Sequence, residues 1–147
     1  PSKELIFNGV YRITKNGFVD LLTSKLNSPT GLAFSTDENY LYVLNQGEVK
    51  YEIVRFPIKK DGTLEKPEMF YDLTSILKDK KGQLGGVAVD KQGNLYVAAP
   101  PGILVISKEG KHIGSILTDA QATSCAIGDN GKTLFIITCN SLYRVKL

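Results

Sequence analysis

Pro29-Thr30-Gly31-Leu32-Ala33-Phe34-Ser35, followed after a polar turn by Tyr40-Leu41-Tyr42-Val43, is a motif that this chain of 147 residues contains three times. The second copy lies within residues 84–97 and the third within residues 122–136. Each copy has a short apolar segment with small residues at its centre, a turn, and a second apolar segment. The turns are rich in Asp, Asn and Gly, which tolerate tight backbone geometry. Each copy therefore predicts a β-hairpin, and the repetition predicts a fold built from similar units.

A third strand is predicted after each hairpin, and a fourth copy of it stands alone near the start of the chain. These strands are Val10–Ile13, Ile53–Phe56, Ile103–Ile106 and Leu142–Val145. An outer strand follows three of them, at Val19–Thr23, Met69–Leu73 and His112–Leu117. Three of the third strands carry an arginine, and we expect these side chains to face solvent because the two sides of a half-exposed strand alternate. They are Arg12, Arg55 and Arg144.

Small residues in the first strand of each unit favour a β-propeller over a β-sandwich. They indicate that these strands pack closely around a narrow axis. The larger side chains of Tyr42, Tyr96 and Phe135 would then fill the wider space between units. Units of four strands and roughly 40 to 55 residues predict a β-propeller of four-stranded antiparallel blades. A β-sandwich is the competing architecture, since regular short strands fit it too. The small residues are Gly31, Ala33, Gly86, Ala88, Ser124 and Ala126.

The predicted strands do not complete a ring. With the strands of a blade named a to d from the axis outward, the chain reads c-d, a-b-c-d, a-b-c-d, a-b-c. We predict one partial propeller over residues 1–147, with a blade fragment at 1–27, blades at 28–75 and 83–118, and an incomplete blade at 121–147. Propellers have four to eight blades, and exposed strand edges are normally covered. We therefore expect a second propeller half as partner, either another copy of the chain or the N-terminal half of a longer propeller.

Composition excludes several classes of function. Eighteen Lys and Arg against fifteen Asp and Glu give a net charge of +3, and no basic block supports a nucleic-acid partner. No apolar run reaches the roughly 18 to 20 residues that a membrane helix needs, and the first ten residues do not resemble a secretory signal. We expect no membrane partner and a soluble protein, with the cytoplasm as the favoured location.

Cysteine and histidine offer little chemistry. Cys125 and Cys139 are too few for a disulfide scaffold, and the hairpin register places Cys125 opposite Ile136. Both are therefore predicted to be buried, unpaired thiols. His112 is the only histidine and is expected to face solvent on an outer strand, so neither a Ser/His/Asp triad nor a Cys/His zinc site is predicted.

Four further motifs are spread along the chain. They are Asn8-Gly9-Val10-Tyr11-Arg12, the run Ser28–Glu38, Gly86-Val87-Ala88-Val89-Asp90 and the closing Ser141-Leu142-Tyr143-Arg144-Val145. Together they resemble the senescence-marker-protein/gluconolactonase family, in its bacterial gluconolactonase branch. The resemblance implies a six-bladed propeller of which this chain is the C-terminal half, about three blades. It also implies metal-assisted hydrolysis of a sugar lactone, with one divalent cation, Ca²⁺ or Zn²⁺, at the top of the central channel.

The same resemblance implies where the cation ligands stand. One is the Asn of a Pro-Asn-Gly-Leu-Ala run and another the Asp of a Pro-Asp-Gly run one blade on; here these channel-mouth positions are Thr30 and Gly85. Because ligand charge tunes affinity for such ions, this chain alone is not expected to bind the cation. Asn45, Gln46 and Thr123 are candidate polar residues on the substrate side.

Two functions follow as hypotheses. The first is a gluconolactonase-like hydrolase, impaired by Thr30 and Gly85, that takes a small sugar-lactone-like ligand. The second is a non-catalytic propeller module for binding or assembly, since a fold does not determine a function.

Overall fold

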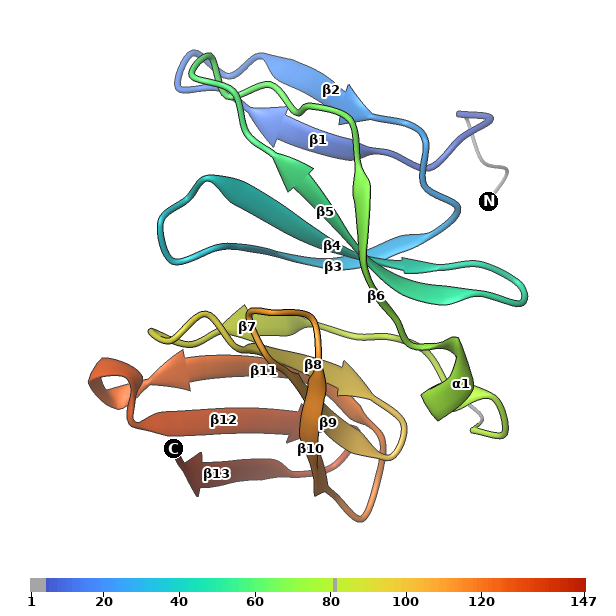
Figure 1. Ribbon diagram of the computed structural model, residues 1–147, viewed down its shortest axis with the longest axis vertical. Helices are drawn as coiled ribbons and strands as arrows, with labels where there is room; N and C mark the ends of the chain where they lie inside the picture. Colours follow the sequence, from blue (N-terminus) through green and yellow to red (C-terminus); the bar gives the residue numbers. More distant parts are fainter. Residues whose placement is uncertain (1–4, 81) are drawn as a thin grey trace.

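Thirteen β-strands in four antiparallel sheets make up nearly all the regular structure of residues 5–80 and 82–147, which this computed structural model describes. Within each sheet the strands pair in the order of the chain, apart from the direction in which the sheet is read. Figure 1 shows the sheets following one another from the N-terminal to the C-terminal end. The predicted propeller blades are confirmed, and a sandwich of two facing sheets is not what the chain forms.

The sheets contain two, four, four and three strands. The first pairs β1 (Val10–Ile13) with β2 (Val19–Thr23). The second holds β3 (Pro29–Phe34), β4 (Tyr40–Gln46), β5 (Tyr51–Pro57) and β6 (Glu68–Asp72). The third holds β7 (Val87–Val89), β8 (Leu95–Ala99), β9 (Gly102–Ile106) and β10 (His112–Leu117). The last holds β11 (Ala122–Gly128), β12 (Thr133–Thr138) and β13 (Leu142–Lys146).

A short helix, α1 (Thr74–Leu77), follows β6 and was not anticipated from the sequence. It places Leu77 in the apolar core between the second and third sheets. A single 3-10 turn covers Asp129–Gly131 between β11 and β12. Within the described ranges, no helix has the length and apolar character needed to cross a membrane.

The inner strands β3, β7 and β11 lie side by side, and their small residues allow this close approach. A Cβ atom on Gly31 would lie 2.4 Å from the carbonyl oxygen of Gly85, and one on Gly86 would lie 2.7 Å from the Oγ atom of Ser124. Interiors are packed too densely to absorb an added methyl group at such distances. The predicted crowding along the axis is confirmed.

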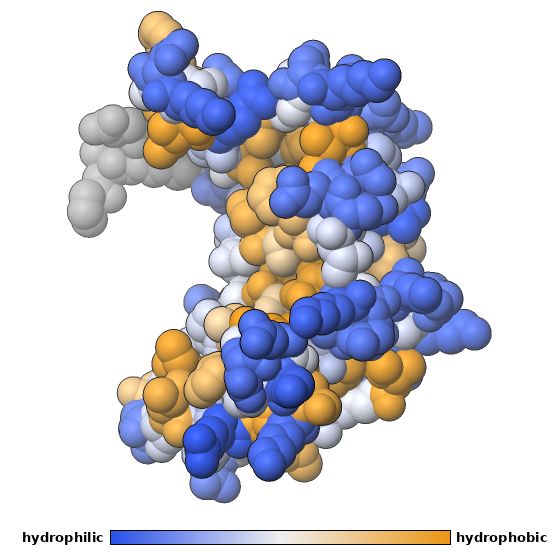
Figure 2. Space-filling model, turned by 90° about the vertical axis from the view of Figure 1, so that its left-hand side faces the viewer, coloured by the Kyte–Doolittle hydropathy of each residue, from blue (hydrophilic) through white to orange (hydrophobic). Residues whose placement is uncertain are grey.

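Apolar side chains fill the space between each pair of neighbouring sheets. Tyr42 and Tyr96 are buried in two of these clusters, as expected. Phe135 has the same place on β12, but no further sheet covers it, and it is only half-buried. In Figure 2 the molecule is an arc with a hollow on one side, and apolar side chains reach the surface at both ends of it.

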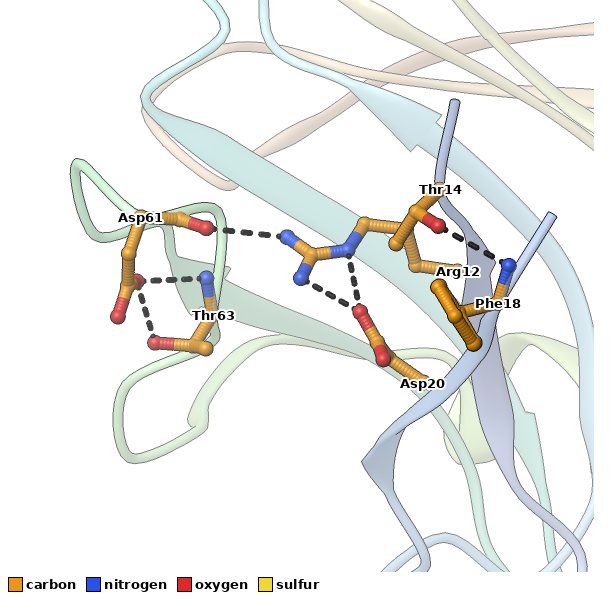
Figure 3. A network of polar contacts seen from close by, with 6 residues as sticks. All are labelled: Arg12, Thr14, Phe18, Asp20, Asp61 and Thr63. Carbon is orange, nitrogen blue, oxygen red and sulfur yellow. Dashed lines mark hydrogen bonds and ion pairs between the residues drawn. The ribbon is translucent and has the colours of Figure 1, made fainter. Parts of the chain in front are cut away.

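Arg12 connects the first sheet to the second (Figure 3). Its Nε and Nη2 atoms donate to Oδ2 of Asp20 at 3.2 and 2.8 Å, and Nη1 donates to the carbonyl oxygen of Asp61 at 3.1 Å. Arg55 likewise donates to Glu68 on the adjacent strand, at 2.7 Å. Arg144 is exposed, as expected, but Arg12 and Arg55 are partly buried, because each has a carboxylate partner on the neighbouring strand.

The two cysteines differ in environment. Cys125 pairs with Ile136 across β11 and β12, as predicted, and both thiols are free. Burial raises the pKa of the Cys125 thiol to about 11. The expectation of a buried thiol is wrong for Cys139, which is exposed because it lies in the turn between β12 and β13.

We predict that a thiol reagent at pH 8 modifies Cys139 quickly and Cys125 only after unfolding. The thiolate is the reactive form, and a raised pKa keeps Cys125 protonated at that pH. Stopped-flow absorbance should show one fast thiol, which Cys139→Ser removes and Cys125→Ser leaves in place. A fast phase that survives Cys139→Ser would contradict this assignment.

Candidate functional site

Thr30, Gly85 and Thr123 occupy equivalent places near the start of three inner-strand segments. Antiparallel pairing brings the ends of the second strands to the same side, since Pro29 lies opposite Asn45 and Ala122 opposite Thr138. In the middle blade, the N–H of Gly85 donates to the carbonyl oxygen of Ala98 at 2.9 Å. We call the group Thr30, Gly85 and Thr123 the channel mouth.

Contacts at these positions, or at the residue next to them, join three blades. The carbonyl oxygen of Gly85 lies against Gly31, next to Thr30. The carbonyl oxygen of Thr123 accepts a hydrogen bond of 3.0 Å from the N–H of Gly86 and lies against Gly85. The structure therefore brings together three residues that are far apart in the sequence.

Gly85 itself lies outside a regular strand. The inner strand of this blade is β7 (Val87–Val89), shorter than the predicted segment; before it, the N–H of Gly85 bonds to Ala98 of β8 and the N–H of Gly86 bonds to Thr123 of the next blade. A Cβ atom at position 85 would lie 2.2 Å from the carbonyl oxygen of Thr123 and 3.2 Å from the Cβ atom of Ala98. The position has no space for a side chain.

Asn45 and Gln46 form hydrogen bonds within the protein. Asn45 is 6% exposed; its Oδ1 atom accepts from the N–H of Ser28 at 3.1 Å, and its Nδ2 atom donates to Glu52 at 2.9 Å. Gln46 accepts the N–H of Leu84 at 2.9 Å and so connects the second blade to the third. These bonds hold the loops around the mouth; contact of either residue with a substrate remains a prediction.

The exposed groups of the mouth are neutral hydroxyls. Thr30 and Thr123 are both exposed, and the Thr123 hydroxyl donates to the carbonyl oxygen of Ile137 at 3.2 Å. A hydroxyl that donates one hydrogen bond can still accept others. Both threonines can therefore accept hydrogen bonds from a polyhydroxylated ligand.

Glu52 is a carboxylate near the mouth that the sequence analysis did not single out. Its side chain is 15% exposed, and its second oxygen lies 2.6 Å from the Nζ atom of Lys50. The hydrogen bond to Glu52 raises the pKa of the exposed Lys50 ammonium. The β4–β5 register, which sets Asn45 opposite Glu52, is the signal that could have found it.

The residues present do not fit a divalent cation. Within residues 5–80 and 82–147, no group of three or more His, Cys, Asp or Glu side chains is placed to hold a metal ion. Hard dications prefer carboxylate-rich sets of oxygen ligands. At the two implied ligand positions, Thr30 offers one neutral oxygen and Gly85 offers none.

Four-stranded sheets around a line of small residues, with a polar site at one end of the inner strands, define the chain as part of a β-propeller. The family model described as SMP-30/Gluconolactonase/LRE-like region matches residues 1–140. The chain belongs to that family, and the resemblance seen in its motifs is confirmed.

Relatives of known name extend this comparison. Gluconolactonase of Zymomonas mobilis is 32% identical over 148 residues, which cover 98% of this chain and 42% of the relative. The solved gluconolactonase of Xanthomonas campestris is 30% identical with a TM-score of 0.86, and the match covers 100% of this chain and 47% of that one. The calcium-binding protein regucalcin of Agrobacterium tumefaciens shares the fold, with a TM-score of 0.75 at 24% identity over 90% of this chain and 45% of its own. The chain thus spans about half the length of these proteins.

We predict that Asn45→Ala lowers the free energy of unfolding by about 1–3 kcal/mol, because it leaves the N–H of Ser28 without its acceptor and removes a donor to Glu52. Thr30→Ala, the control on the neighbouring exposed position, should change it by less than about 0.5 kcal/mol. Urea unfolding followed by circular dichroism measures both. Equal effects of the two substitutions would argue against the structural role of Asn45.

Proposed function

We propose that this chain forms part of a sugar-lactone hydrolase of gluconolactonase type, with its site at the channel mouth and with reduced hydrolytic capacity. The observation that carries the proposal is the joining of Thr30, Gly85 and Thr123 at one end of the inner strands, in a chain that matches gluconolactonases along its length. The hydrolytic capacity is reduced because Thr30 offers one neutral oxygen at its implied ligand position and Gly85 has no side chain.

The residues of this half suit binding better than bond cleavage. The hydroxyls of Thr30 and Thr123 can hydrogen-bond the hydroxyl groups of a lactone ring, and the bonds of Asn45 and Gln46 keep the surrounding loops in place. Hydrolysis places negative charge on the carbonyl oxygen, and fixed donors or cations aimed at that oxygen accelerate the reaction. The channel mouth has no cationic side chain among its three residues.

A second candidate is a propeller module that binds or assembles without catalysis. Two observations favour it: the side chains of Asn45 and Gln46 hydrogen-bond to other groups of the protein, and Gly85 has no side chain. Propellers support many such roles on one scaffold.

We also propose that a second propeller half closes the ring. At the N-terminal end, β1 pairs on one side only, and Leu32 and Phe34 of β3 are 50% and 54% exposed. A hollow of about 410 Å³ lies beside Leu32, lined by residues 9–11, by residues 29–32 of β3, among them Thr30, and by Val43 of β4. At the other end, Ile137 and Leu142 are exposed, and β13 pairs with β12 alone among the residues that the structure describes. Free edges and apolar faces of this kind need a cover.

The number of strands favours the N-terminal half of a longer propeller as that partner. Thirteen strands are described here, and two copies would supply 26, whereas six four-stranded blades take 24. A single longer chain avoids the surplus of two strands. About half of such a chain would be the part described here, in agreement with the 47% of the Xanthomonas campestris gluconolactonase that the match covers.

The hydrolysis proposal predicts slow turnover of D-glucono-1,5-lactone by the completed ring. With added Ca²⁺, Zn²⁺ or Mn²⁺, kcat/KM should be lower than that of the Zymomonas mobilis gluconolactonase by about 100-fold or more, the usual cost of losing one electrostatic stabiliser. A pH-stat assay measures both proteins side by side. Equal rates would refute the impairment, and binding without any turnover would favour the non-catalytic module.

The closure proposal predicts that Leu32→Lys and Phe34→Lys prevent the chain from joining its partner half, because a buried ammonium without a partner is costly. Ile113→Lys on the outer strand β10 is the matched control, since Ile113 is 58% exposed and its sheet lies between the second and fourth sheets, away from either end of the arc. Size-exclusion chromatography with light scattering follows the association. A monodisperse, cooperatively unfolding monomer that is unaffected by either substitution would contradict closure.

A further inference from the structure

Gly85 not only lacks a side chain that could bind a cation; its contact with Thr123 also leaves no space for one. A Cβ atom at Gly85 would meet the carbonyl oxygen of Thr123 at 2.2 Å and its carbonyl carbon at 2.7 Å. Both are backbone atoms of the next blade and cannot swing aside as the end of a flexible side chain would. Any residue other than glycine at position 85 requires movement of one blade against another.

Hydrogen bonds hold the same contact in place. The N–H of Gly86 donates to the carbonyl oxygen of Thr123 at 3.0 Å, and the N–H of Gly85 donates to Ala98 at 2.9 Å. Ala98 also donates a hydrogen bond back to the same segment: its N–H donates to the carbonyl oxygen of Gly86 at 2.9 Å. Shifting Gly85 to admit a side chain would break these bonds, and buried backbone groups without partners are costly.

Thr30 differs from Gly85 in this respect. It is exposed at the start of β3, where it lines the hollow beside Leu32, so within this half of the ring a larger amide side chain there has open space. The two implied ligand positions are therefore not equivalent: one could regain its ligand by a single substitution, whereas the other is occupied by the backbone of the neighbouring blade.

We infer that the backbone contact at Gly85 closes the second cation-ligand position in this protein, so that the channel mouth binds its ligand without a divalent cation. The inference rests on the proposed function for the class of ligand, a neutral polyhydroxylated ring. The hydroxyls of Thr30 and Thr123, one on each side of Gly85 in the row of inner strands, hold that ring by hydrogen bonds. The position of Gly85 serves the packing of the blades and has no ligand role.

Two glycines in the chain provide a matched test of the contact. Gly85→Ala should lower the Tm of the completed ring by about 5 °C or more, because overpacking against backbone is costly. Gly114→Ala on β10 should change it by less than about 1 °C, since nothing lies within 4 Å of the added methyl group. Differential scanning calorimetry measures both. An unchanged Tm for Gly85→Ala would overturn the inference.

Calorimetric titration of Ca²⁺ and Zn²⁺ into the Thr30→Asn/Gly85→Asp double variant tests the closure of the cation position. No stoichiometric cation binding is expected in the double variant or in the unaltered protein. Tight cation binding by the unaltered protein, or by a double variant with the same Tm as the unaltered protein, would overturn the inference. If the double variant does not fold, the contact is supported and the Gly85→Ala result remains decisive.

The ligand is tested separately with a non-hydrolysable cyclic ether analogue of the lactone. Its Kd for the unaltered protein should change less than twofold when a chelator is added, whereas a tenfold weakening would overturn cation-independent binding. Failure of the analogue to bind at all would refute the proposed function and this class of ligand. The Gly85→Ala measurement would still decide whether the blade contact closes the position, so the two failures are distinguishable.

Discussion

The structure depends on how closely its inner strands approach one another. At Gly31 and Gly85 the backbone of the next blade lies where a Cβ atom would be, and at Gly86 the Oγ atom of Ser124 does, so small residues alone permit the approach. The wider spaces farther from the axis take Tyr42 and Tyr96. Small residues inside and aromatic residues outside make the sheets fan out, which is why the chain forms an arc (Figure 2).

The same close approach places the candidate site. It joins the starts of the inner-strand segments, so Thr30, Gly85 and Thr123 meet at one end although long stretches of chain separate them. Polar residues around them stabilise the arrangement: Gln46 bonds to the next blade, and Asn45 holds Ser28 and Glu52. Much of the hydrogen-bonding capacity near the site is therefore used within the protein, and the exposed hydroxyls of Thr30 and Thr123 are neutral.

A propeller scaffold does not by itself determine the chemistry of its site. The chain matches gluconolactonases over nearly all its length, and its blades have the family's architecture. Packing of blades constrains many residues weakly, whereas a metal-dependent reaction constrains a few residues strongly. On the proposed assignment of Gly85 to a ligand position, its backbone contact would change the chemistry while the propeller is retained.

The sequence by itself determined the order of the strands, the turns of the hairpins and the register that sets Cys125 opposite Ile136, because alternation and turn residues are local properties of the chain. It also determined that small residues line the axis. Only the tertiary structure decided that Cys139 is exposed, that Arg12 reaches Asp61, that Gln46 bonds to Leu84, and that Gly85 lies against Thr123. The contacts of Arg12, Gln46 and Gly85 depend on how one blade stacks on the next, and no local pattern of residues encodes that distance. The exposure of Cys139 follows instead from its place in the turn after β12.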